Sequence, residues 1–429
     1  MSAFTTLEQE REVEDRIHWA LTHGIGMGQP FVHAPITIHP YHYPSSQFTK
    51  AKALAPLFNV LVERIARDPT WLIETLRPTA VSDEFVRRLI EIYEKVLVGG
   101  IKQTVSLAIT RSDYMLHVKE GDPKGLLQVE INTIASSFGS LSTRIAEMHS
   151  ELEAFAGSAH QVHNHDALDE IASGLASGHR AYMRQAGRQV DTDLGIAMIV
   201  QPGERNFADQ RLLQFQLWQN YRVRCYRITL AEMHERGRLQ SNGTQDELII
   251  DGICVSVVYF RSGYSPDDHP TEKEWDARLL IEKSYAIKCP TIAYHLAGCK
   301  KIQQVLAEPC VLERFVASPT HRDELRSVFA GLYSLSASPD SPEAAALTDL
   351  RHKVIAAKGE NYVMKPQREG GGNNIYGEDV GTALQTMSVE EQSAYILMER
   401  ILPPSAPSKL LRNNQLTEVR HVVVLCLLV

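Results

Sequence analysis

The sequence has few of the features that mark secreted, membrane-spanning or nucleic-acid-binding proteins. Its six cysteines form no CxxC pair, which argues against a disulfide framework and against a zinc site of that type. The longest late apolar run, residues 421–429, is far too short to span a bilayer. Its 44 basic residues are outnumbered by 52 acidic ones, whereas nucleic-acid binders are usually basic.

The beginning of the chain also lacks the pattern of a targeting segment. Residues 1–16 are rich in acidic side chains and contain no apolar run. Signal peptides need an apolar segment, and transit peptides avoid acidic residues. We therefore expect a cytoplasmic protein with reduced cysteines. A length of 429 residues with 44% hydrophobic residues is typical of two or three globular domains.

Apolar spacing divides the chain into three parts and predicts a mixed α/β (α+β) fold. The first part, 1–190, has expected helices at 7–22, 51–66, 82–98 and 141–156, strands at 103–109 and 127–134, and a connector at 33–44. The second, 191–299, has expected strands at 195–201, 223–230, 247–252 and 255–260 and helices at 208–220 and 274–284. This β-α-β rhythm predicts a small parallel sheet covered by helices. The third, 300–429, has an expected helix at 302–306, a loop at 334–342, and strands at 361–365 and 395–399.

The most informative motif is NYVMKPQREGGGNNIYG, residues 361–377. A strand delivers Lys365, and Gly370, Gly371 and Gly372 follow as a loop whose backbone amides can approach a ligand closely. Successive amides of this kind bind anions, and a lysine can add a charge on the same phosphate. Glu369 could hold a magnesium ion that bridges phosphates. The lysine precedes the glycines, so this is not the P-loop pattern. The alternative is a solvated turn with incidental charge.

A second motif, QVEINTIASSFGSLSTR, occupies residues 128–144. On a strand, Glu130 and Asn132 share one face, while Val129 and Ile131 point to the other. An acid and an amide on one face offer oxygen ligands to magnesium. The same pair also fits the solvent-exposed face of an edge strand. The phosphate-binding pattern elsewhere in the chain favours the metal.

Seven motifs in one order resemble those of the eukaryotic-type glutathione synthetases, which belong to the ATP-grasp superfamily. They are RSDYM (111–115), EINTIxxSFG (130–139), ERNFADQ (204–210), VVYFRSGY (257–264), LAGCKK (296–301), KPQREGGGNNIYG (365–377) and YILME (395–399). The resemblance extends to about residue 413. It implies an ATP-grasp ligase with a helical N-terminal region, a small substrate-binding α/β domain and a C-terminal nucleotide-binding part.

The resemblance also implies a role for individual residues. The expected catalytic residues are Lys365 and Arg111, and the expected magnesium ligands are Glu130, Asn132 and Glu369. The expected ATP-binding residues are Glu130, Lys300, Lys365, Pro366, Gln367, Arg368, Glu369, Gly370, Gly371, Gly372, Asn373, Asn374, Tyr376, Met398, Glu399, Arg400 and Ile401. The expected substrate-binding residues are Arg111, Ile134, Ala135, Ser136, Ser137, Glu204, Arg205, Asn206, Gln210, Arg261, Ser262, Gly263 and Tyr264. Ala135 stands where the family often has a serine.

In this family γ-glutamylcysteine and glycine are joined at the expense of ATP, and the members form homodimers. The chemistry of the residues agrees with such a reaction. A carboxylate is a poor acyl donor until ATP converts it to an acyl phosphate, and magnesium and lysines neutralise the phosphates during that transfer. Arginine suits a carboxylate-rich dipeptide because its planar guanidinium binds carboxylates with two parallel hydrogen bonds. A closing lid keeps water away from the acyl phosphate.

The resemblance is lost after LLRNNQLTEV, residues 410–419. The family continues there with a Ser-Glu-Leu-Gly strand, and the residues that close over the substrates come later. We expect the nucleotide-binding part to be truncated or divergent here, with an exposed sheet edge and weak activity. The alternatives to an active synthetase are an inactive or regulatory homologue and a ligase for another amine acceptor such as β-alanine.

Overall fold

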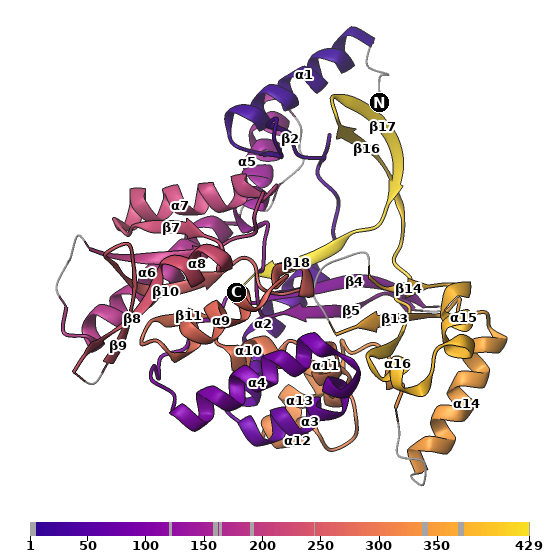
Figure 1. Ribbon diagram of the computed structural model, residues 1–429. Coiled ribbons are helices and arrows are strands. Elements are labelled where there is room, and N and C mark those ends of the chain that lie inside the picture. Colours follow the sequence, from indigo (N-terminus) through magenta and orange to yellow (C-terminus); the bar gives the residue numbers. More distant parts are fainter. Residues whose placement is uncertain are drawn as a thin grey trace.

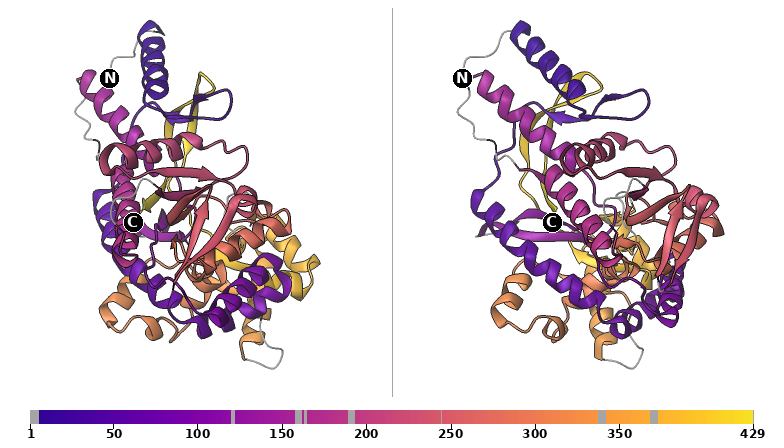
Figure 2. Two further views of the ribbon diagram at one scale, coloured as in Figure 1. Left: turned by 60° about the vertical axis from the view of Figure 1, so that its left-hand side comes forward. Right: turned by 90° about the vertical axis from the view of Figure 1, so that its left-hand side faces the viewer.

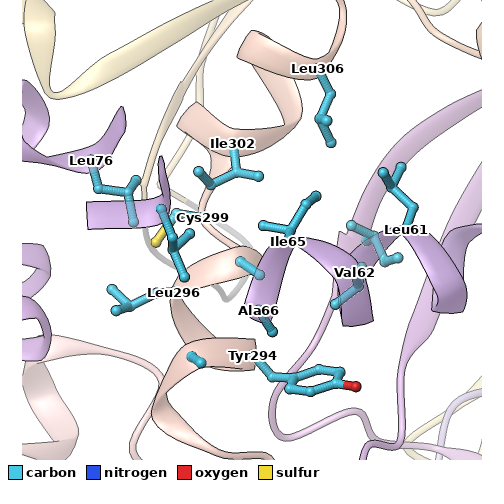
Figure 3. Packing of buried hydrophobic residues seen from close by; sticks show 14 of the residues in the cluster. Leu61, Val62, Ile65, Ala66, Leu76, Tyr294, Leu296, Cys299, Ile302 and Leu306 are labelled. Atoms are coloured by element: carbon cyan, nitrogen blue, oxygen red, sulfur yellow. The ribbon is translucent and has the colours of Figure 1, made fainter. Parts of the chain in front are cut away.

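The computed structural model describes residues 6–119, 122–157, 162, 165–188, 193–243, 245–336, 342–367 and 373–428. Its helical body, at the bottom of Figure 1, is built from two groups of helices that are far apart in the sequence. They are α2 (Ser45–Ala66), α3 (Pro69–Ser82), α4 (Glu84–Gly99), α10 (Ile292–Ala297), α11 (Lys300–Leu306), α12 (Leu312–Phe315) and α13 (Pro319–Arg326). Leucine, isoleucine and valine side chains from both groups fill the largest apolar core, part of which Figure 3 shows.

Two aspartates set the boundaries of the helices in this body. Asp68 and Asp83 accept hydrogen bonds from Trp71 N (3.1 Å) and Val86 N (3.0 Å), so each caps the first turn of the helix that follows it. The sequence analysis missed α3, although Asp68 followed by proline is a helix-start signal. It also began α2 six residues too late.

A three-stranded antiparallel sheet covers the helical body. It has the order β18 (Val424–Leu428), β4 (Arg111–Lys119), β5 (Asp122–Asn132). The strand expected at 103–109 is wrong, since residues 101–110 are irregular. There the Gln103 oxygen accepts from Val105 N (2.8 Å) and its nitrogen donates to Tyr285 O (2.9 Å). Leu107 N donates to Lys288 O of β11 (Ile287–Cys289) at 3.4 Å, so the segment lies beside that strand without forming a regular ladder.

The predicted parallel sheet is confirmed, at the left of Figure 1. The strands run in the order β7 (Cys225–Ile228), β6 (Leu194–Ile199), β10 (Ile253–Phe260), β9 (Gln245–Ile250), β8 (Gly237–Asn242), and β11 (Ile287–Cys289) also pairs with β10. The pairs β6–β7, β6–β10 and β10–β11 are parallel, whereas β9 and β8 are antiparallel additions. Asp251 and Gly252 join β9 to β10, and their positive φ angles of 48° and 85° favour a tight hairpin.

Helices cover this sheet and separate it from the rest of the chain. They are α5 (Gly139–Phe155), α6 (Ala167–Gln185), α7 (Phe207–Tyr221), α8 (Leu230–Arg236), α9 (Glu272–Lys283) and the short 3-10 helix η1 (Pro266–Asp268). Two apolar clusters, one on each face, bury the central strands completely. Burial on both faces explains why β6 and β10 read as continuous apolar runs.

A small antiparallel sheet forms the lower right of Figure 1. Its order is β12 (Leu332–Ser334), β15 (Tyr395–Glu399), β13 (Tyr362–Pro366), β14 (Ile375–Tyr376). The helices α14 (Pro342–Ala356), α15 (Glu378–Thr386) and α16 (Val389–Ser393) accompany it. The strands predicted at 361–365 and 395–399 are confirmed. Most of the loop expected at 334–342 lies outside the described residues.

The remaining elements place the N-terminal segment beside the hairpin of residues 406–421, at the top of Figure 1 and in both views of Figure 2. They are α1 (Thr6–Thr22), β1 (Gly26–Met27), β2 (Val32–His33), β3 (Ile36–Thr37), β16 (Ala406–Arg412) and β17 (Gln415–His421). The hairpin of β16 and β17 turns at Asn413 and Asn414, which both have positive φ, and β16 pairs with β3. Residues 406–428 therefore join sheets with N-terminal strands, an arrangement that the sequence did not predict.

The mixed α/β class expected from the sequence is confirmed. The helices of the described residues are too short or too polar to cross a membrane. The domain boundaries at 190 and 299 remain a prediction.

Candidate active site

The polar ends of β4 and β5 form the base of the candidate site. In the antiparallel register Arg111 lies opposite Asn132, and Asp113 lies opposite Glu130. The Arg111 guanidinium donates to both carboxylate oxygens of Asp113 at 2.8 Å, and the Asn132 amide donates to the same carboxylate at 3.2 Å. The predicted pair Glu130 and Asn132 therefore lies beside the predicted Arg111. Asp113 was missed, although its position in RSD, two residues after Arg111, places it on the same strand face.

Glu130 and Lys300 form an ion pair in the centre of this group. The distance from Lys300 Nζ to Glu130 Oε2 is 3.0 Å, and the lysine is 3% exposed. Burial alone would raise the pKa of Glu130, but the nearby charges of Lys300, Lys365 and Arg111 outweigh it and lower the pKa to about 2. The carboxylate is therefore ionised at neutral pH.

A glycine allows Lys300 to reach Glu130. Gly298 packs against Thr133, just after β5, and a Cβ on Gly298 would lie 2.2 Å from the Thr133 hydroxyl oxygen. Lys300 opens α11 two residues later. The close approach of these two segments thus explains the glycine of the LAGCKK motif.

Lys365 reaches the same place from the small antiparallel sheet. Its ammonium donates to the backbone oxygen of Val129 at 2.9 Å, and its side chain is buried. Val129 is the extra residue of a β-bulge, because Asp113 pairs with Glu130 while Tyr114 pairs with Gln128. A bulge takes one residue out of the ladder, and here its carbonyl accepts from the lysine instead.

One face of the small sheet looks towards β5. The register aligns Leu332, Met398, Val363 and Tyr376 in one row across its strands. Met398 and Val363 pack in an apolar cluster to which Leu127 and Val129 of β5 also contribute. Lys365, two residues after Val363, shares this face. The predicted ATP-binding residue Met398 and the predicted phosphate-binding Lys365 therefore lie on one sheet face, on the side of β5 and the Glu130 group.

The other predicted nucleotide-binding residues surround this face. Gln367 accepts from Lys301 N at 2.7 Å, which ties β13 to the start of α11. Asn374 donates to the Tyr376 hydroxyl at 3.0 Å, and Glu399 accepts from the Tyr333 hydroxyl at 2.7 Å. Pro366 is the last residue of β13, and Asn373 directly precedes Asn374. After β15, the backbone amide of Arg400 donates to Asn361 O, and the Ile401 side chain is buried. Arg368, Glu369, Gly370, Gly371 and Gly372 lie outside the described residues.

A second group of predicted residues gathers where β6 meets α7. Glu204 accepts from Asn206 N and from the Gln210 amide, both at 2.7 Å. Arg227 of β7 donates to the Gln210 oxygen at 3.0 Å. Burial and the nearby Arg211 lower the pKa of Arg227. The sequence analysis missed Arg227, because nothing local indicates that β7 lies beside β6. Arg205 takes part through its backbone, whose oxygen accepts from Gly28 N.

A fully buried ion pair connects the second group with the loop after β5. Arg261 Nη2 lies 2.8 Å from Asp209 Oδ2, and the two side chains are 3% and 2% exposed. The Asp209 carboxylate also accepts from the backbone amides of Phe138, Ser140 and Leu141, at 3.0–3.1 Å. The pair therefore holds the start of α5 against the end of β10.

The loops around this pair carry the remaining predicted substrate residues. In the loop after β5, the Ile134 side chain is buried and Ala135 has a φ of 52°. The Ser136 hydroxyl donates to the backbone oxygens of Ile109 and Asn132, and Ser137 is the next residue of the loop. After β10, the Asp268 carboxylate accepts from Ser262 Oγ and from the amides of Gly263 and Tyr264. Gly263 has a φ of 91°, which only glycine adopts readily.

The site as a whole consists of two polar groups joined by residues 133–141. The first contains two carboxylates, Glu130 and Asp113, with two lysines and an arginine, and the second offers carboxylate, amide and guanidinium groups. Glu130 and Asn132 are oxygen-bearing side chains that fit a hard cation such as Mg²⁺. Within the described residues, three His, Cys, Asp or Glu side chains do not gather at one point, and the third predicted ligand, Glu369, is not among those residues.

Comparisons with known proteins agree with this arrangement. The family model of the ATP-binding domain of eukaryotic glutathione synthase matches residues 7–427. A glutathione synthetase of Dictyostelium discoideum is 40% identical, over 95% of this chain and 87% of that protein. A chloroplastic glutathione synthetase of Solanum lycopersicum is 43% identical, over 90% and 68%. The enzyme of Mus musculus is 35% identical, over 96% and 87%.

The fold also resembles a solved structure. The apo form of a glutathione synthetase-like effector from Globodera pallida superposes with a TM-score of 0.76, over 99% of this chain and 90% of that one. The two sequences are 21% identical, so this likeness concerns the fold alone.

Proposed function

The chain belongs to the eukaryotic glutathione synthetases, and on this basis we propose that it joins γ-glutamylcysteine to glycine with ATP, releasing glutathione, ADP and phosphate. The observation that carries the proposal is the group formed by Glu130, Lys300 and Lys365. Two buried lysines lie around the Glu130 carboxylate, beside the sheet face that also carries Met398. Lysine ammonium groups of this kind bind the phosphates of ATP.

The first chemical step requires that the dipeptide carboxylate and the γ-phosphate of ATP meet in this group. Lys300 and Lys365 neutralise charge on the phosphates during transfer, and their burial strengthens this effect because water is excluded. The product of the step is an acyl phosphate. The glycine amine then attacks the acyl carbon, and phosphate leaves with the bonding electrons.

Glu130 and Asn132 would hold magnesium, together with Glu369 according to the family pattern. A magnesium ion held there would supply positive charge that stabilises the transferring phosphate. Pro366, Gln367 and the glycine-rich segment would cover the phosphates, and the backbone from Met398 to Ile401 would lie along the adenine.

The second polar group, together with Arg111 of the first, would hold the dipeptide. Arg111 lies beside Glu130 and is kept in place by Asp113, so it can bind the reacting carboxylate. Glu204, Asn206 and Gln210 provide acceptors and donors for the γ-glutamyl amino acid group. Arg261 is held by its pair with Asp209, and Asp268 holds the Ser262–Tyr264 loop that follows it.

Two finer properties belong to the same proposal. We expect a homodimer, because α7 and the neighbouring β1–β2 hairpin expose Phe31, Val32, Phe215 and Trp218, and Phe31 also contacts Phe207 of α7. Light scattering after gel filtration would give the mass. We also expect a reducing compartment such as the cytoplasm, because all six cysteines are free thiols. Imaging of the tagged protein in its native cell would test that compartment.

The deciding experiment follows ADP release by residues 1–429 with ATP, Mg²⁺ and γ-glutamylcysteine. Turnover should require glycine, should be weaker with β-alanine, and should disappear in Lys365→Ala. Lys358→Ala is the matched control, because Lys358 is exposed and pairs only weakly with Glu378 at 3.4 Å. Soluble, folded protein without glycine-dependent turnover would overturn the proposal. Removing Mg²⁺ with EDTA should abolish turnover and restoring it should recover the rate.

A further inference from the structure

A cavity of about 480 Å³ lies apart from the candidate active site. Its walls come from α2, α4, the irregular segment 101–106, β11 and the start of α10. Figure 3 shows the ring of Tyr294, which lines the cavity from α10, beside Ala66 of α2. The cavity shares no lining residue with the predicted nucleotide or dipeptide sites.

A buried lysine that the proposed reaction does not use lines this cavity. Lys288 on β11 is 3% exposed, and its ammonium donates to the backbone oxygen of Ser284 at 2.5 Å. Burial lowers the pKa of Lys288 to about 8, although the Glu282 carboxylate opposes this shift. Burying an ammonium group costs free energy unless a partner compensates it. An apolar side chain would fill the same position on β11 without that cost.

The charges around Lys288 leave a positive excess. Glu282 also lines the cavity, and its carboxylate already pairs with the fully buried Arg278 at 3.0 Å. His295 contacts Arg278, and burial lowers its pKa well below the usual value, so it adds no charge at neutral pH. Two buried cations therefore share one carboxylate.

The other titratable groups of the cavity do not remove this excess. They are Glu63, Arg67, Tyr93 and Tyr294. Glu63 accepts hydrogen bonds from both Arg67 and the Tyr294 hydroxyl, so its charge is already engaged. Burial raises the pKa of Tyr93 to about 12, so this phenol is neutral.

The rest of the wall is largely apolar, with Ala66, Val96, Ile101 and Ile292. A ligand that matches both features carries one negative group and a short hydrocarbon body. We propose that this cavity binds a small organic monocarboxylate, with the carboxylate at Lys288 and the apolar body against α2 and α4. The site is independent of the proposed ligase reaction, since Lys288 and Glu282 belong to neither of its polar groups.

The test is calorimetric titration of the full chain with sodium hexanoate, with hexan-1-ol as the uncharged analogue. We expect saturable binding of hexanoate and at least tenfold weaker binding of the alcohol. A charge-assisted hydrogen bond contributes about 1.5–3 kcal/mol, so Lys288→Met should weaken hexanoate binding roughly 10- to 100-fold. Lys283→Met, at an exposed position of α9, should bind as the wild type does.

A second readout does not depend on a variant that folds. Binding of a carboxylate should raise the pKa of Lys288. At pH 8 the binding of hexanoate should therefore be accompanied by proton uptake at Lys288. Titrations in two buffers of different ionisation enthalpy measure this uptake. Equal affinity of hexanoate and hexanol, unchanged affinity in a folded Lys288→Met, or binding without proton uptake would overturn the proposal. Hexanoate binding should persist in Lys365→Ala, which separates this site from the ligase centre.

Discussion

Residues 133–141 join two carboxylate–cation groups, which differ in how deeply their carboxylates are buried. Asp209 has one arginine and three backbone amides, and both partners of the ion pair are buried. Glu130 has two lysines close by and a neighbouring arginine, and its side chain is 24% exposed. The Asp209 group is fully buried, whereas the Glu130 carboxylate is partly exposed and lies among three cationic side chains.

This difference separates a structural ion pair from a ligand site. A matched buried pair holds segments together, because each charge would be costly without the other. The Glu130 group is partly exposed and contains lysine and arginine side chains, which are the residues that bind phosphates and carboxylates. By the same reasoning Arg261, which was expected to contact substrate, belongs to a structural ion pair. Lys300 and Lys365 belong to the proposed ligand site.

The largest expected effect comes from removing one member of the matched pair. Arg261→Met should lower the free energy of unfolding by about 3–5 kcal/mol, because the Asp209 carboxylate would remain buried without its arginine. Urea unfolding monitored by tryptophan fluorescence measures this change. The double variant Arg261→Met with Asp209→Leu should be less destabilised than the sum of its single changes. Additive effects would show that the two groups do not depend on each other.

Substitutions in the Glu130 group should lower the activity more than the stability. Lys300→Met should lower kcat/KM for ATP roughly 10²- to 10³-fold, as expected when one electrostatic contact to the transition state is lost. Steady-state ADP release gives the value. Lys301→Met is the neighbouring control, because the Lys301 ammonium contacts Gln304 and Ser334 instead of Glu130. A similar loss in both variants would contradict the assignment of Lys300.

The pH dependence of stability should carry the signature of Glu130. Its pKa in the folded chain is about 2, below its ordinary value of 4.5. A lowered pKa contributes stability that is present above pH 4.5 and is lost as the pH falls towards 2. The difference in urea midpoint between wild type and Glu130→Gln should therefore shrink between pH 6 and pH 3. A constant difference over this range would show that ionisation of Glu130 does not stabilise the fold.

The smallest effect is expected at an exposed pair, which completes the comparison. Arg236 contacts Asp251, and the two side chains are 45% and 53% exposed. Exposed ion pairs contribute little, because water and salt screen them. Arg236→Gln should leave the urea midpoint unchanged within error. A shift as large as that of Arg261→Met would mean that exposure does not distinguish the two pairs.

The two sheets show how far the sequence could predict the fold. The strands β6 and β10 were predictable because burial on both faces leaves a continuous apolar run. The strand expected at 103–109 is wrong, because its apolar residues pack against the sheet while its backbone stays irregular. The Gln103 side chain bonds Val105 N and Tyr285 O there. Strands β8 and β3 were missed, since β8 is mostly exposed and β3 has only two residues.

The amino-acid sequence by itself determined the residue types of the site, the motifs of the family and most of the long elements, because these depend on local spacing and on side-chain chemistry. Only the tertiary structure decided which charges meet. Lys365 contacts Val129 across 236 positions of the chain, Arg261 contacts Asp209 across 52, and Arg227 joined the site without a motif of its own. Charge matching between such residues arises when strands pair and helices pack, and no local pattern records it.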